Sequence, residues 1–168
     1  MSTDSMYTSE DIRRFLAEVT DPEIPVLNVV EMGIVRKIEF NNDNLIIKIT
    51  PTYSGCPAMS TIESEIHKKL HEKGISKFQV LTDYTEAWTT DWMTDEAKEK
   101  LKDYGIAPPE KTGGSDNILR NLDTIKIILC PYCDSLDTKL QSEFGSTACK
   151  AQYFCNECEE PFEYFKCI

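Results

Sequence analysis

Apolar residues recur at helical spacing near the start of the chain and again after residue 57. In the first segment Thr8 is the expected cap, and the apolar positions are Ile12, Phe15, Leu16 and Val19. Prolines within residues 21–25 are expected to end this helix, because they remove N–H donors and force extended backbone before them. The second predicted helix runs from Pro57 to about Lys73, with Gly74 as its stop. Its inward positions are Met59, Ile62, Ile66 and Leu70.

Shorter apolar stretches between and after these helices predict strands. The first two cover residues 34–40 and 45–50, and the polar turn 41–44 joins them into a hairpin. A third strand is predicted over 78–81 and a short helix over 94–104. The order α-β-β-α-β predicts a small α/β sandwich with a mixed sheet, so that the fold class is α+β.

The composition changes near residue 110. Two prolines are followed there by a small, polar stretch, which is typical of a linker. We therefore expect a first domain over residues 1–110, a linker over 111–117 and a second domain over 118–168. The strands expected in the second domain cover residues 125–129, 151–154 and 162–165.

Six of the seven cysteines lie in the second expected domain. Four of them form two Cys-x-x-Cys knuckles: Cys130, Cys133, Cys155 and Cys158. Two knuckles separated by the length of a hairpin can place four thiolates around one metal ion. This pattern predicts a zinc-ribbon-like β domain in which the ion is part of the core, but it leaves the identity of the metal open. Cys149 and Cys167 could pack or ligate, and ligation by both would favour an iron–sulfur cluster over a lone zinc ion.

Composition and charge narrow the classes of protein. There is no run of about 18 apolar residues that would predict a transmembrane helix, and the first ten residues lack the regions of a secretion signal. We expect a cytoplasmic protein with reduced thiols, in which paired cysteines are metal ligands; a secreted disulfide scaffold is the alternative. A net charge of −11 argues against nucleic-acid binding. Solubility alone explains that charge as well as an electrostatic partner would.

The seventh cysteine, Cys56, stands alone before the second predicted helix. With Pro57 at the first helical position, Cys56 would be the N-cap residue, where unpaired N–H groups and the positive helix end favour a thiolate. Such a thiolate could bind a soft metal, accept a cluster or attack an electrophile. A small buried residue that fills a gap is an equal alternative. His67 and His71 are interpreted as surface residues of the helix, so we do not expect a Cys–His hydrolase.

Two carboxylates and two tryptophans occupy other loops. Asp21 and Glu23 flank a proline in a rigid loop, and they would lie near Cys56 if both loops met at one end of the sheet. From local sequence alone, turn formation by solvated acids is the favoured interpretation. Trp88 and Trp92 suggest an interface anchor, which would permit a homodimer, or a cover over the sheet.

These segments resemble a known family. The runs at residues 21–25, 33–35 and 50–57 are similar to the SufT-like family of iron–sulfur cluster assembly domains. Further runs resemble the PaaD family of the phenylacetyl-CoA epoxidase (ring-oxygenase) systems: residues 88–92, 104–109, 130–133, 142–150 and 165–167. The resemblance covers nearly the whole chain from about residue 8. One departure is Glu31-Met32, where the wider family tends to have Asp-Leu.

The resemblance implies a role in phenylacetate catabolism, beside a diiron monooxygenase that epoxidises phenylacetyl-CoA. Other subunits there carry the diiron site, and a reductase carries flavin and an iron–sulfur cluster. An accessory or maturation protein is implied, with Cys56 as a transient ligand of iron or a cluster, Asp21 and Glu23 shaping its loop, and structural zinc in the tail. The expected partners are the epoxidase subunits or the reductase.

The chain has no Glu-x-x-His helix pair and no glycine-rich dinucleotide loop, so we do not expect it to catalyse the oxygenation itself. The alternative is an electron-transfer or structural subunit whose C-terminal cysteines hold an iron–sulfur cluster.

Overall fold

The computed structural model of the chain describes residues 7–42, 44–109 and 127–166. The chain divides into two compact units, residues 1–88 and 89–168. This division differs from the expected domain boundary at residue 110, since residues 89–107 group with the C-terminal unit. The expected linker, residues 111–117, lies outside the described residues.

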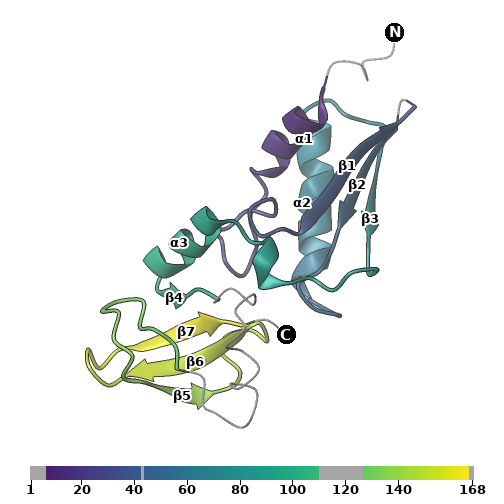
Figure 1. Cartoon of the computed structure of the whole chain (residues 1–168). Helices are drawn as coiled ribbons and strands as arrows, with labels where there is room; N and C mark the ends of the chain where they lie inside the picture. Colours follow the sequence, from purple (N-terminus) through teal and green to yellow (C-terminus); the bar gives the residue numbers. More distant parts are fainter. Residues whose placement is uncertain (1–6, 43, 110–126, 167–168) are drawn as a thin grey trace. The chain divides into compact units, whose positions relative to one another are not determined.

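The first unit has the predicted order of elements (Figure 1). These are α1 (Ser9–Leu16), β1 (Val35–Asn41), β2 (Asn44–Ile49), α2 (Ala58–Glu72) and β3 (Phe78–Thr82). In the sheet order β1-β2-β3, β1 runs antiparallel and β3 parallel to β2. The α+β class and the mixed sheet are therefore confirmed, with both helices on one face of the sheet.

Alternation in β2 and helical spacing in α2 build the core of this unit. Leu45, Ile47 and Ile49 are buried on one face of β2, and Ile62, Ile66 and Leu70 are buried on α2. These spacings follow from side-chain periods of 2.0 in a strand and 3.6 in a helix. Met59, which was expected to point inward, is only partly buried.

The first helix begins as predicted and ends sooner. Thr8 caps it through a capping box, in which Asp11 N–H donates to the Thr8 hydroxyl and the Thr8 N–H donates to the Asp11 carboxylate. The helix ends at Leu16, with Ala17 as its C-cap, so the prolines of residues 21–25 do not end it. A turn intervenes, in which the Val19 N–H donates to the carbonyl of Leu16.

The second unit joins a short helical segment to a four-stranded sheet. Its elements are η2 (Thr90–Trp92), α3 (Asp95–Asp103), β4 (Ile106–Ala107), β5 (Thr138–Ser142), β6 (Lys150–Cys155) and β7 (Pro161–Phe165). The sheet order is β4-β7-β6-β5, and β4 runs parallel to β7 while the other pairs are antiparallel.

The outcomes for the strands of this unit differ. Helix α3 and strands β6 and β7 match the predicted segments. The strand expected over 125–129 is wrong for residues 127–129, which form no strand, and its first two residues lie outside the described part. Strand β5 takes its place beside β6. Its sequence, Thr-Lys-Leu-Gln-Ser, is mostly polar because it is an edge strand with little burial.

Across the described residues, no helix is both long enough and apolar enough to cross a membrane.

Candidate metal centre and the Cys56 loop

Two turns of nearly identical backbone present the four tail cysteines. The N–H of Cys130 donates to the carbonyl of Ser135 at 3.0 Å, and the N–H of Cys155 donates to that of Glu160 at 3.0 Å. Each turn ends in a residue with left-handed backbone, φ 59°: Asp134 and Glu159. The repeated geometry aims two sulfurs from each turn at one point, as the Cys-x-x-Cys spacing predicts.

The four sulfurs converge at metal-binding distance. The Sγ atoms of Cys130 and Cys158 are 3.6 Å apart, as are those of Cys133 and Cys155. All four ligand atoms lie within 4.8 Å of one another. A tetrahedron with metal–sulfur bonds of about 2.3 Å has edges of about 3.8 Å, so the set fits one ion such as zinc or iron.

Burial and hydrogen bonding differ among these thiols. Cys130 and Cys155 are buried, whereas Cys133 is exposed. The backbone N–H groups of Cys158 and Glu157 lower the pKa of Cys155 to about 7 against the opposing effect of burial. Burial raises the pKa of Cys158 to about 12. Four adjacent thiolates therefore need a cation to ionise together, which a bound metal ion supplies.

Cys56 lies on a loop of the first unit, just outside the cap position that was predicted for it. Pro57 is itself the N-cap of α2 and provides no side-chain cap, so the expectation that Cys56 is the N-cap residue is wrong. The carbonyl of Cys56 accepts the Met59 N–H at 3.2 Å, and its Sγ lies 3.9 Å from the Thr52 hydroxyl. Cys56 is partly exposed, and an added Cβ on the preceding Gly55 would meet no atom within 4 Å. The sulfur is thus on an open loop rather than in the core.

Asp21 organises the loop that it begins. Its side chain is buried, and Oδ1 accepts the N–H groups of Glu23 and Ile24, both at 2.8 Å. This is an Asx turn, so the carboxylate holds backbone rather than facing solvent. The expected turn role is confirmed for Asp21, but the expected solvation is not.

Sequence reasoning missed a second loop organiser, Glu31. Its buried carboxylate accepts the Asn28 N–H at 2.8 Å, while Asn28 Oδ1 accepts the N–H groups of Val30 and Glu31 at 3.0 and 2.9 Å. A signal for this role exists in the sequence, because Asn followed three residues later by Glu resembles a capping box. The family resemblance marks Glu31 only as a departure from the usual pattern.

Within residues 7–42, 44–109 and 127–166, only the four tail cysteines bring three or more ligand atoms together. Cys56, Asp21 and Glu23 do not form such a group. His67 and His71 each lie against the ring of Phe78, with ring centroids 4.9 and 5.2 Å apart, and neither joins a metal group. A metal bound at Cys56 would need ligands from another molecule.

Trp88 faces inward. Its Nε1 donates to the carbonyl of Met32 at 3.0 Å, and the side chain is buried. The cover interpretation therefore holds for Trp88, which ties the end of the first unit to the loop before β1. Trp92 is partly buried in η2.

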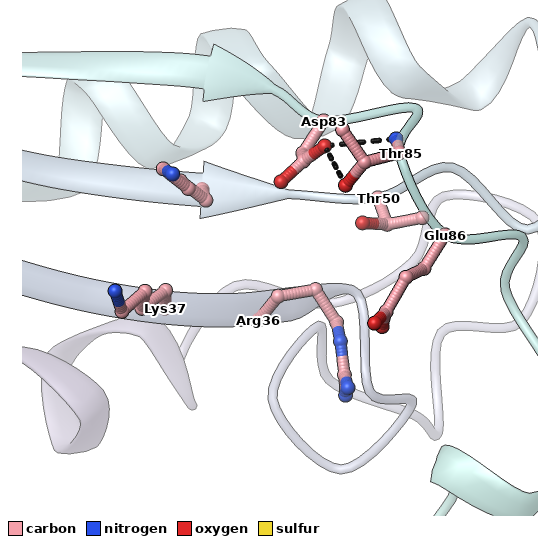
Figure 2. Close-up of a pocket in the computed structure, with 7 residues that line it drawn as sticks. Arg36, Lys37, Thr50, Asp83, Thr85 and Glu86 are labelled. Atoms are coloured by element: carbon pink, nitrogen blue, oxygen red, sulfur yellow. Dashed lines mark hydrogen bonds between the residues drawn. The ribbon is translucent and has the colours of Figure 1, made fainter.

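A polar pocket of about 350 Å³ lies at the end of the first unit's sheet. It is lined by Arg36, Lys37, Lys48, Thr50, Asp83, Thr85 and Glu86 (Figure 2). Asp83 Oδ1 accepts the N–H and hydroxyl of Thr85 at 2.9 and 2.6 Å, and Lys37 pairs with Glu39 at 2.6 Å. Because cations and carboxylates alternate around it, the pocket does not select a ligand of one charge.

Comparisons with known proteins match both units. A model described as an iron–sulfur cluster assembly protein matches residues 9–81, and one described as a PaaD zinc β-ribbon domain matches residues 115–166. A crystal structure of a domain of unknown function, DUF59, from Bacillus anthracis covers 55% of this chain and 90% of its own, with 27% identity and a TM-score of 0.52.

Two relatives carry functional descriptions. An Fe-S protein maturation auxiliary factor of Porphyromonas gingivalis is 32% identical over 103 residues, which is 60% of this chain and 97% of that protein. An Escherichia coli protein, described as one of the subunits of 1,2-phenylacetyl-CoA epoxidase, is 44% identical over 158 residues, which is 94% of this chain and 92% of that protein. With both regional models matched and this relative aligned over nearly its full length, the chain belongs to the PaaD family.

Proposed function

We propose that this protein is an accessory subunit of a phenylacetyl-CoA epoxidase system in phenylacetate catabolism, and that it assists the delivery of iron or an iron–sulfur cluster through Cys56. The description of the Escherichia coli relative supports the system, and that of the Porphyromonas gingivalis relative supports a maturation role. The proposed partners are epoxidase subunits or an iron–sulfur reductase. We place the protein in the cytoplasm, where its thiols stay reduced.

The observation that carries the delivery role is the open setting of Cys56. Its sulfur is partly exposed on a loop, and no second or third protein ligand converges on it among the described residues. A single thiolate binds a metal weakly enough to release it, whereas a closed set of four does not. The client or a second copy of the chain would supply the remaining ligands.

Asp21 and Glu23 support this role through the loop rather than as ligands. The Asp21 carboxylate is engaged by two N–H groups of its own loop, one of which belongs to Glu23. In this proposal it keeps one rim of the sheet end rigid while Cys56 exchanges its cargo.

For the tail we propose structural zinc. Sulfur separations of 3.6 Å suit four bonds to one ion, because thiolates that each bind a different iron of a cluster must lie farther apart. The alternative, an electron-transfer subunit with a cluster in the tail, predicts brown protein with visible charge-transfer absorption. Metal analysis after anaerobic purification distinguishes the two, since zinc leaves the protein colourless.

Substitution of Cys56 tests the delivery role. In cells whose only copy carries Cys56→Ser, we expect a folded, metal-loaded protein and a reductase partner with a lowered cluster content, measured as iron and acid-labile sulfide. Ser54→Ala, an exposed position in the same loop, is the matched control and should leave the cluster content unchanged. Full cluster occupancy of the reductase in the Cys56→Ser cells would rule out this role.

A further inference from the structure

Residues 89–107, here called the α3–β4 segment, fall between the two matched regions, which end at residue 81 and begin at residue 115. By its contacts the segment belongs to the compact unit that holds the metal centre. It also follows Trp88 directly, so it is the part of the chain by which the second unit begins.

The segment touches the first knuckle at two points. Gly105 has φ +86°, and a Cβ built on it would lie 2.6 Å from the hydroxyl of Tyr132 and 3.1 Å from its ring. Tyr132 stands between the ligands Cys130 and Cys133, so the knuckle packs directly on the Gly105 backbone. Any larger residue at position 105 would be strained by the backbone and would collide with that ring.

The second point is an ion pair at the end of the same knuckle. Lys102 Nζ lies 2.5 Å from Asp134 Oδ1, and Asp134 immediately follows the ligand Cys133. Its left-handed backbone completes the turn that aims the two sulfurs. Both points of contact are thus set by the conformation that metal ligation holds in place.

Strand β4 brings the segment into the core of the unit. It pairs with β7 through Ile106 opposite Glu163 and Ala107 opposite Tyr164. Ala107 is fully buried in one apolar cluster with Cys130 and Cys155. A strand of two residues has no stability of its own, so it depends on the sheet and the knuckle beside it.

We propose that metal binding at the four cysteines and docking of the α3–β4 segment are coupled. Metal–thiolate bonds hold the first knuckle in the form that presents Tyr132 and Asp134, and loss of the metal releases the segment. Because the segment continues directly from Trp88, metal occupancy then determines whether the chain after the first unit is docked or a free tether. This coupling does not depend on the proposed role of Cys56.

Hydrogen exchange of the full chain tests the coupling. With zinc bound, amides of residues 95–107 should be protected, and removal of zinc by a chelator should speed their exchange at least tenfold. Amides of α2 in the first unit should not change. Equal protection of residues 95–107 with and without zinc, or none in either state, would overturn the proposal.

The coupling must also act in the reverse direction, because linkage between two equilibria is reciprocal. Gly105→Ala should weaken zinc binding about tenfold in competition with a chromophoric chelator. Gly74→Ala is the matched control: its φ is +79°, but no atom lies within 4 Å of the added Cβ, and it should leave the zinc affinity unchanged. Wild-type zinc affinity in Gly105→Ala would contradict the coupling.

A milder pair of variants covers the case in which Gly105→Ala does not fold. Lys102→Ala removes only the exposed ion pair to Asp134 and should weaken zinc binding about twofold at low salt, with a smaller effect at high salt. Lys98→Ala, on the same helix, should have no effect. Equal zinc affinities for these two variants at low salt would count against the proposal.

Discussion

At the scale of single residues, the first unit uses buried polar side chains to shape loops. Asp21 and Glu31 are both nearly inaccessible, and each accepts N–H groups of its own loop. A buried carboxylate is tolerated there because charge-assisted bonds replace its hydration. Cys56 differs from them in being partly exposed, with its sulfur 3.9 Å from the Thr52 hydroxyl.

Asp21 provides a stability prediction. Asp21→Ala removes the acceptor of two buried N–H groups and should lower the free energy of unfolding by about 1–3 kcal/mol. Asp21→Asn keeps an oxygen at the same position and should cost less. Urea unfolding of the zinc-loaded full chain measures both values, and equal losses would show that the Asx turn is not the cause.

At the scale of elements, helix ends follow local chemistry closely. The capping box of α1 and the Thr94 cap of α3, whose hydroxyl accepts the Ala97 N–H at 3.1 Å, place both starts where the sequence predicts them. By contrast, α2 begins after Pro57 with no side-chain cap, so its start depends on the loop that packs before it.

The capping box of α1 gives a pH-dependent prediction. Hydrogen bonds from the Thr8 backbone and hydroxyl, and then the Arg14 guanidinium, lower the pKa of Asp11 to about 2. Since this pKa is below that of the unfolded chain, the contribution of Asp11 to stability is complete above about pH 4 and is lost as the pH falls towards about 2.

Comparison with Asp11→Asn by urea unfolding checks this. The variant should be less stable than the wild type at about pH 6, and the difference should vanish near pH 2. Glu10→Gln removes a charge from the same turn without removing the capping contact, and it should show a smaller difference. A difference between wild type and Asp11→Asn that stays constant across this range would contradict the assignment.

At the scale of the whole molecule, two units with different sources of stability share one chain. The first has an aliphatic core, including Ile47 and Ile66, whereas the core of the second includes the ligands Cys130 and Cys155. A small sheet of this kind has too little apolar area to fold without its ion.

Removal of the metal should therefore affect the units unequally. A chelator should abolish the unfolding transition of the second unit and leave that of the first unchanged. Circular dichroism during urea titration, with and without zinc, resolves two transitions if the units unfold separately. A zinc-dependent shift of both transitions by the same amount would argue against independent cores.

Local signals in the sequence determined most of the elements of this protein and the ligand set of its metal centre. Caps, apolar periodicity and Cys-x-x-Cys spacing act within a few residues, so they predict α1, α3, β6, β7 and the knuckles without knowledge of the fold. The PaaD resemblance adds that the two parts occur together.

Contacts between distant residues decided the rest. Trp88 bonds to a carbonyl 56 residues earlier, β5 is a strand only because β6 pairs with it, and the α3–β4 segment joins the ribbon through Tyr132 and β7. The convergence of four sulfurs to one point also depends on how two turns, 22 residues or more apart, are held by one sheet. Sequence patterns report the preferences of neighbouring residues, whereas which distant surfaces meet depends on the packing of the whole unit.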